Sequence, residues 1–190
     1  MKVTGEETAK IENTIKTVDL GCGPKKRAGA FGVDHFPYPG VDVVCNLNHF
    51  PWPLEGGLFN EVYASHVIEH IKSIPDFMRE IYRISQDGAI VKISTPHFTS
   101  IDSWKDPTHL WHLSAEWYAP FCEPDKYLAS QLSGFEVIDS EVKFSSSLRN
   151  IIPKAICYFW GQKKWEKHYA FRYPAKNIYT TLRVVKRVGQ

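Results

Sequence analysis

The stretch Val18-Asp19-Leu20-Gly21-Cys22-Gly23-Pro24 decides the fold of this chain, because a short apolar run there ends in a glycine turn. Gly21 and Gly23 allow the backbone to turn tightly and to approach a ligand without a Cβ in the way. In open α/β sheets, ligands bind outside the carboxyl ends of the strands, where such a turn lies. The stretch therefore predicts a buried strand followed by a ligand-binding loop.

Two common phosphate-binding patterns do not fit this loop. The dinucleotide pattern needs a third glycine where Lys26 stands, and the Gly-Lys-Ser/Thr ending of a P-loop is missing. The next apolar run ends in Asp34, whose carboxylate can accept hydrogen bonds from both hydroxyls of a ribose. The two features together predict a nucleoside-containing ligand, and an α/β turn without a ligand is the alternative.

Short apolar runs recur along the rest of the chain and alternate with connectors. A helix is expected after Ser73, which forms a capping box with Asp76, and a second helix is expected over residues 115–132. This alternation predicts a Rossmann-like three-layer α/β sandwich with a mostly parallel sheet. Strands are expected at residues 17–20, 31–34, 41–45, 62–65, 89–94, 135–144 and 178–186.

Four segments, in this order, resemble the class I S-adenosylmethionine-dependent methyltransferases, and among them the compact type 11-like members. They are residues 19–24 (Asp-Leu-Gly-Cys-Gly-Pro), 32–34 (Gly-Val-Asp), 45–47 (Cys-Asn-Leu) and 63–71 (Tyr-Ala-Ser-His-Val-Ile-Glu-His-Ile). The resemblance implies seven strands with the last one antiparallel, S-adenosylmethionine as cofactor and S-adenosylhomocysteine as product. It also implies cofactor contacts from Asp19, Gly21, Cys22, Gly23, Asp34, Asn46, Leu47, Ser65 and His66.

The chain departs from the family pattern at two places. The connection between Gly23 and Asp34 is too short for the usual helix, so residues 25–30 are expected to form a loop or a single turn. Asn46 stands where the family has an acid, and an amide oxygen can still accept a hydrogen bond from the adenine amino group. Cofactor binding is therefore expected, with a weaker adenine contact.

The methyl acceptor is expected beside the fifth strand. His97 follows this strand, and Asp106 and His109 belong to an Asp-Pro-x-His segment that closes over the active site in related methyltransferases. Methyl transfer is an in-line displacement, to which orientation alone contributes roughly 7–11 kcal/mol. A hydroxyl acceptor also needs a base, and His97, Asp106 and His109 are the candidates.

No metal site is predicted from the histidines. His66 and His70 stand at helical spacing and His109 lies near His112, but the glutamate of a His-Glu-x-x-His motif is missing. Neither pair has an obvious third ligand nearby in the sequence, so hydrogen-bonded histidines are expected.

The composition is that of one globular domain over residues 1–190, with 43% apolar and 23% charged residues. A formal net charge of +2 argues against nucleic acid as the main partner, and a small-molecule acceptor is expected. Four dispersed cysteines favour reduced thiols, and no run approaches the roughly 18 apolar residues of a membrane-spanning helix. We expect a cytoplasmic protein, whose oligomeric state the sequence does not indicate.

Residues 145–177 are rich in aromatic and lysine residues and are expected to carry a helix of their own, inserted as a lid over the acceptor site. A packed subdomain or a dimer contact is the alternative interpretation. Two further functions fit the sequence: a nucleoside-binding module without catalysis, and an RNA- or membrane-associated methyltransferase-like protein that uses this segment.

Overall fold

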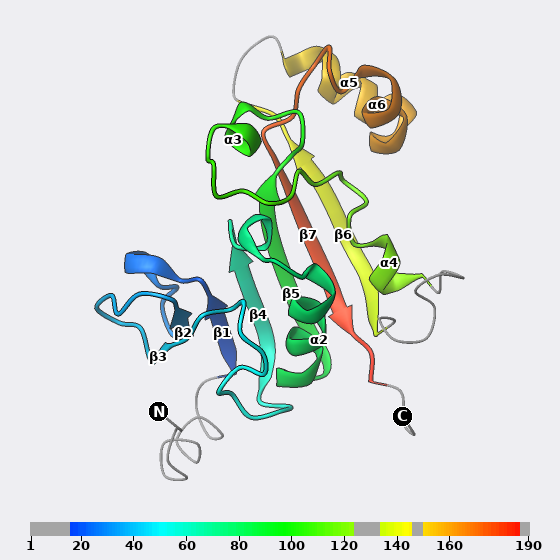
Figure 1. Cartoon of the computed structure of the whole chain (residues 1–190). Helices are drawn as coiled ribbons and strands as arrows, with labels where there is room; N and C mark the ends of the chain where they lie inside the picture. Colours follow the sequence, from blue (N-terminus) through cyan, green and yellow to red (C-terminus); the bar gives the residue numbers. More distant parts are fainter. Residues whose placement is uncertain (1–15, 124–133, 146–149, 187–190) are drawn as a thin grey trace.

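The computed structural model describes residues 16–123, 134–145 and 150–186 (Figure 1). One seven-stranded sheet forms its centre, with the strand order β3-β2-β1-β4-β5-β7-β6. Strands β1 to β5 pair in parallel, whereas β7 runs antiparallel to both of its neighbours. The expected sheet is therefore confirmed. Its strands are β1 (Thr17–Leu20), β2 (Phe31–Asp34), β3 (Val43–Val44), β4 (Phe59–Ser65), β5 (Ser85–Pro96), β6 (Phe135–Lys143) and β7 (Asn177–Val184).

The inner strands form where apolar residues are buried from both sides. Val18, Leu20 and Val33 have no exposed surface, as expected for strands in the middle of a parallel sheet. Because β1, β2 and β4 are parallel, their carboxyl ends meet at one edge of the sheet. The glycine turn after β1 lies at this edge and continues into η1 (Gly23–Lys25), which begins before the loop expected over residues 25–30. Residues 26–30 contain no helix, as expected.

Helix α2 (Ile74–Ile84) confirms the predicted capped helix between the fourth and fifth strands. The Ser73 hydroxyl accepts a hydrogen bond from the Asp76 amide at 3.3 Å and donates one to the Asp76 carboxylate at 2.6 Å. Phe77 and Ile81 lie on one face and are fully buried in the core beneath the sheet. This face holds α2 against the strands that lead to the site.

Several predicted boundaries differ from the structure, among them the start of β4 at Phe59 rather than at residue 62 and the end of β7 at Val184 rather than at residue 186. β3 is shorter than expected, because only Val43 and Val44 find partners on β2. β5 begins before Asp87-Gly88 rather than after it, since the pairing with β4 jumps past these residues as a bulge. The helix expected from residue 115 is wrong at its start: α4 (Ala119–Cys122) begins later, because Pro120 suits a first turn and is unfavourable inside a helix. Its remainder at 124–132 lies outside the described residues.

The segment between β6 and β7 carries helices of its own, α5 (Ile151–Trp160) and α6 (Gln162–Tyr169). Figure 1 shows this pair beyond the end of the sheet, beside the short helix α3 (Ile101–Trp104). Trp165 of α6 is fully buried against His97, at a ring-centroid distance of 5.3 Å, and so anchors the pair to β5. In the part of the chain described, no helix is long and apolar enough to cross a membrane.

Candidate active site

The loop after β1 depends on glycine for a steric reason. Gly21 has φ +64°, and a Cβ at this position would lie 2.4 Å from Cγ2 of Val67. Its amide donates a hydrogen bond of 2.7 Å to the carbonyl of Val33, which ties the turn to β2. Gly23 also has a left-handed φ, of +58°. Gly21 is therefore required by close packing against Val67, whereas nothing lies within 4 Å of a Cβ position at Gly23, which leaves space at the strand ends.

The Asp34 carboxylate organises the entrance to this space. One oxygen accepts the Gly23 amide at 2.8 Å and the other accepts the Phe36 amide at 2.9 Å. A carboxylate has about four acceptor positions, so two remain for a ligand. Asp34 thus combines the structural role of holding the glycine loop with the capacity to bind hydroxyl groups.

A cavity of about 490 Å³ opens at this edge of the sheet. Gly21, Gly23, Asp34, Asn46, Leu47 and His66, all predicted to contact the cofactor, line it. Asp19, Cys22 and Ser65 are absent from the lining. Side chains that the sequence analysis did not assign complete the wall: Pro24, His35, Phe36, Tyr38, Asn48, Val67, His70 and Ile71.

The three residues outside the lining act on the loop and the strand ends instead. Asp19 accepts the backbone amide of Arg27 at 2.9 Å and so holds the short connection to β2 in place. The Ser65 hydroxyl lies 2.9 Å from that of Ser94, between β4 and β5. Burial, and then the neighbouring carboxylates, raise the pKa of Cys22, which keeps this thiol protonated.

Phe36 and Tyr38 are the main unassigned part of the wall. Their ring centroids are 6.0 Å apart, and both rings are substantially exposed beside the cavity. The sequence could have indicated this role, because both rings follow Asp34 closely. Aromatic rings after an acid that binds ribose can cover the flat face of a base. The Oδ1 of Asn46 accepts the Asn48 amide at 2.9 Å, which leaves one acceptor position on this oxygen and the amide nitrogen for a ligand.

A second cavity, of about 400 Å³, adjoins the first and shares His66 and His70 with it. Asp106 and His109, two of the predicted acceptor-side residues, line this second cavity. The remaining lining residues are Glu69, Pro96, Asp102, Lys105, Lys176 and Asn177. We refer to the two spaces as the cofactor-side cavity and the acceptor-side cavity.

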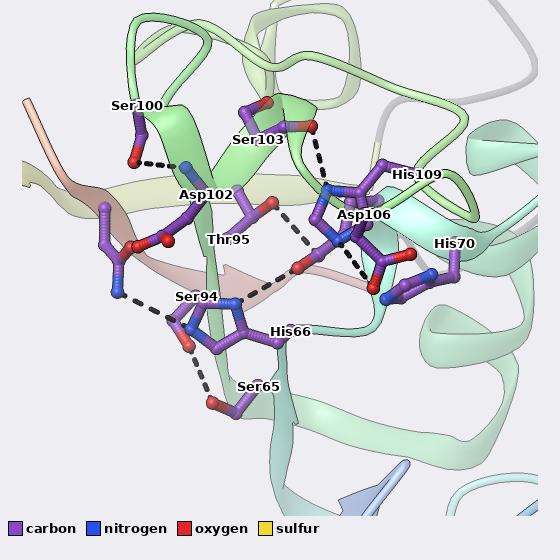
Figure 2. A network of polar contacts seen from close by, with 12 residues as sticks. Ser65, His66, His70, Ser94, Thr95, Ser100, Asp102, Ser103, Asp106 and His109 are labelled. Atoms are coloured by element: carbon purple, nitrogen blue, oxygen red, sulfur yellow. Dashed lines mark hydrogen bonds and ion pairs between the residues drawn. The ribbon is translucent and has the colours of Figure 1, made fainter.

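His66 stands between the two cavities in a constrained conformation, with φ +57°. Its Nδ1 donates to the buried carboxylate of Glu69 at 3.1 Å, which leaves the Nε2 lone pair directed toward Asn177 Nδ2, 3.5 Å away (Figure 2). Glu69 is only 1% exposed and also accepts from the Thr95 hydroxyl at 3.0 Å. The hydrogen bond to Glu69 raises the pKa of His66.

The loop after α3 brings Asp106 and His109 to the same place (Figure 2). His109 donates from Nδ1 to the Ser103 carbonyl at 2.9 Å, and its Nε2 lies 3.9 Å from the Asp106 carboxylate. Hydrogen bonds from the hydroxyl and the amide of Thr108 lower the pKa of Asp106. Two predicted acceptor-side groups are thus adjacent in space.

The sequence matches the model of a methyltransferase-domain family over residues 4–140, which is more than half of the chain. The chain belongs to this methyltransferase family. This membership confirms the resemblance to class I S-adenosylmethionine-dependent methyltransferases. Among proteins with curated descriptions, none matches the sequence.

Solved structures show that the fold of this methyltransferase is widely shared. A SAM-dependent methyltransferase from Archaeoglobus fulgidus superposes with a TM-score of 0.59 at 15% identity, covering 94% of this chain and 90% of that one. A second, from Mesorhizobium loti, has a TM-score of 0.53 at 14% identity, with coverages of 95% and 98%. The 16S rRNA (adenine(1408)-N(1))-methyltransferase of Catenulisporales acidiphilia, solved with SAM, has a TM-score of 0.56 at 14% identity, with coverages of 100% and 95%.

His97 of the methyltransferase lies apart from both cavities. It is fully buried, and its Nδ1 accepts hydrogen bonds from the Thr99 amide and hydroxyl at 3.2 and 2.7 Å. Its Nε2 donates to Glu166 of α6 at 2.9 Å. Both ring nitrogens are therefore used inside the protein, and the structure does not bring His97 together with Asp106 and His109.

Proposed function

We propose that S-adenosylmethionine occupies the cofactor-side cavity and that a small polar acceptor enters the acceptor-side cavity. The observation that carries this proposal is the wall shared by the two spaces, to which His66 and His70 both belong. Because His66 and His70 line both spaces, the two spaces adjoin at these residues, and reactants bound in them can lie next to each other. Such alignment is the main requirement for methyl transfer.

The residues of the cofactor-side cavity fit a sulfonium nucleoside. Asp34 has acceptor positions for ribose hydroxyls, and the space beside Gly23 is open, since nothing lies within 4 Å of the position that a Cβ would take there. Leu47 and Ile71 supply an apolar surface for a base. When bound, S-adenosylmethionine supplies a methyl group carried on a positively charged sulfur.

His66 is the residue placed to move a proton at the acceptor. Its Nδ1 hydrogen is held by Glu69, so the lone pair on Nε2 is fixed in direction. An acceptor hydroxyl or amine that loses a proton on methylation can transfer it to this Nε2. Glu69 is thereby a positioning residue, which orients the imidazole and stabilises its positive charge.

The acceptor-side cavity suits a polar molecule of modest size. Acidic and basic side chains alternate in its lining, with Asp102 and Asp106 beside Lys105 and Lys176. A volume of about 400 Å³ falls within the range typical of small-molecule sites. An acceptor rich in hydroxyl groups can bond to this lining, and an apolar one would leave its charges without partners.

Calorimetric titration tests the proposal. S-adenosylmethionine and S-adenosylhomocysteine are expected to bind with micromolar affinity, whereas NAD and ATP serve as controls that should not bind. A panel of polar acceptors is then screened for release of S-adenosylhomocysteine. If the two sulfur nucleosides bind but no acceptor on a broad panel releases product, the protein is instead a nucleoside-binding module.

The exposed surface of α5 favours a second candidate function, attachment to an anionic membrane. Tyr158 and Phe159 of α5 and Phe171 after α6 are 83%, 75% and 85% exposed. Nζ of Lys164 on α6 lies 5.8 Å from the ring centroid of Trp160 at the end of α5. Apolar rings next to basic residues are typical of interfacial binding. Sedimentation with phosphatidylserine vesicles should recover the protein at low salt and lose it on charge reversal of Lys163, Lys164 and Lys167. Vesicle binding that is unchanged by salt and by these substitutions would contradict attachment to an anionic membrane.

A further inference from the structure

We propose that the acceptor-side cavity binds a divalent transition-metal ion between Glu69, His70 and His109. One ligand atom from each of these side chains lies within 4.8 Å of the others. All three line the same cavity, and the rings of His70 and His109 meet edge to face at a centroid distance of 4.7 Å. Two imidazoles and one carboxylate are a common ligand set for such ions.

The remaining ring nitrogens of both histidines are arranged as in metal sites. His109 donates from Nδ1 to the Ser103 carbonyl at 2.9 Å, and Nδ1 of His70 lies 3.0 Å from the Thr108 hydroxyl. In metal centres, a ligating histidine almost always uses its other nitrogen in this way, which fixes the ring and directs the free lone pair. Each ring therefore has Nε2 left for an ion.

Glu69 has the capacity to act as the third ligand. Its carboxylate is almost fully buried, yet its two hydrogen bonds, from His66 and Thr95, use only half of its acceptor positions. A buried negative charge is costly unless it is paired with positive charge. A cation next to the two histidines compensates this charge more completely than His66 alone.

The backbone keeps the three ligands together. The amides of Leu110 and Trp111 donate to the carbonyl of Glu69 at 2.8 and 3.3 Å, which attaches the loop carrying His109 to η2 (Ile68–His70). The indole nitrogen of Trp111 also donates to the Ile71 carbonyl at 2.7 Å. The ligand set is therefore preorganised by contacts that do not involve the ligand atoms.

A second, independent observation in this cavity points to a ligand. Asn177 is 8% exposed and lines the cavity, and its Oδ1 has no hydrogen-bond partner among the residues that the structure describes. A buried carbonyl oxygen without a donor is rare. A ligand or water molecule bound beside His66, whose Nε2 lies 3.5 Å from Nδ2 of the same amide, provides the donor that this oxygen lacks.

The donor set selects the class of ion. Imidazole nitrogen suits Zn²⁺, Co²⁺, Fe²⁺ and Mn²⁺, whereas Mg²⁺ and Ca²⁺ prefer oxygen ligands alone. Asp106, with an oxygen 3.9 Å from Nε2 of His109, stands next to the site as a further oxygen donor. The role of the ion rests on the proposed function: it holds an oxygen atom of the acceptor beside the wall shared with the cofactor-side cavity.

Titration with Co²⁺ and Zn²⁺ tests the proposal on the full chain, because Co²⁺ reports its ligands through visible absorption bands. Wild-type protein is expected to bind one Co²⁺ per chain and to release it to Zn²⁺. H109Q and H70Q should each weaken binding at least tenfold. H112A is the matched control: His112 lies in the same loop, but it stacks on Trp104 and bonds to Ser103, away from the cluster.

Far-ultraviolet circular dichroism shows whether each variant is folded, because His70 also lines the cofactor-side cavity and its substitution can alter cofactor affinity. S-adenosylmethionine affinity, measured on the same samples, separates this inference from the proposed function. Retained cofactor binding with no Co²⁺ binding by the wild-type protein would overturn the metal site alone. Equal Co²⁺ affinity in H109Q, H70Q and wild type would also overturn it, since the ion would then bind elsewhere. Metal binding without cofactor binding would overturn only the proposed function.

Discussion

The two cavities lie side by side but are built in different ways. Apart from the shared turn of residues 66–71, the lining of the cofactor-side cavity comes from one stretch of chain, between Gly21 and Asn48. The lining of the acceptor-side cavity comes from residues 66–70, 96, 102–109 and 176–177, on four separate segments. The first cavity is therefore built mostly from one stretch of chain, whereas the second exists only after β7 has paired with β5.

This difference explains why a sequence motif identifies the role of some site residues and not of others. The glycine turn and Asp34 act through the backbone within a few residues of themselves, so their spacing carries their role. His109 meets His70 and Glu69 through a loop whose position depends on hydrogen bonds to a distant turn. Substitutions that reduce either turnover or cofactor binding, but not both, test whether the two cavities have separate functions.

The largest difference between the effect on turnover and the effect on cofactor binding is expected from His109→Ala. This side chain lines only the acceptor-side cavity, so turnover should fall about 10²-fold or more while the Kd of S-adenosylmethionine stays unchanged. Release of S-adenosylhomocysteine with an acceptor found by screening, together with calorimetry, measures both quantities. His112→Ala should leave both unchanged, and a weakened cofactor Kd in His109→Ala would contradict the division into two cavities.

Gly21→Ala should act on the cofactor side and on folding. The added Cβ meets Val67 at 2.4 Å and the residue keeps a left-handed φ, which together cost about 2–5 kcal/mol of unfolding free energy. Gly29→Ala is the control: it has φ +75° with open space around its Cβ position, so only about 1–2 kcal/mol is expected. Urea denaturation compares them, and equal losses would show that the contact with Val67 has no cost.

Asp34→Ala should weaken cofactor binding by about 1–3 kcal/mol, or roughly 5- to 150-fold in Kd, because hydrogen bonds to a charged acceptor are lost. Asp42→Ala is matched to it, since Asp42 also accepts a backbone amide, that of Gly32 at 2.7 Å, but does not line the cavity. Calorimetry should show an affinity loss for the first variant only. An unchanged Kd in Asp34→Ala would mean that the ribose lies elsewhere.

The smallest effect is expected from Glu166→Gln, far from the cofactor. Burial raises the pKa of Glu166, but the hydrogen bonds from His97 and the Ala115 amide outweigh it, so the pKa lies below 4.5. The ionised Glu166 carboxylate therefore stabilises the fold above the pKa of the unfolded chain, and this contribution is lost as the pH falls through the folded pKa.

The substitution should cost about 1–2 kcal/mol at neutral pH and reduce the loss of stability on acidification below pH 4.5. Denaturation at several pH values measures both effects. Glu116→Gln, at an exposed pair with Lys163, should change little. An unaltered pH profile in Glu166→Gln would show that the buried pair does not contribute to acid sensitivity.

The prediction from sequence was accurate where local pattern decides and inaccurate where tertiary context decides. The capped helix α2 and the buried strands β1 and β2 follow directly from residue spacing. β3 came out shorter and β5 longer than expected, because the length of a strand depends on the partners available beside it. His97 follows β5 as expected, yet Glu166 and Thr99 occupy both of its nitrogens.

By itself, the sequence determined the glycine loop, the acid at the end of β2 and the order of motifs that indicates the methyltransferase family, because each depends on the backbone within a few residues. Only the tertiary structure decided that Glu69, His70 and His109 meet, and that His66 stands between two cavities. Loop positions and ring directions depend on hydrogen bonds between distant segments, such as that from Leu110 to Glu69, which no spacing in the chain encodes.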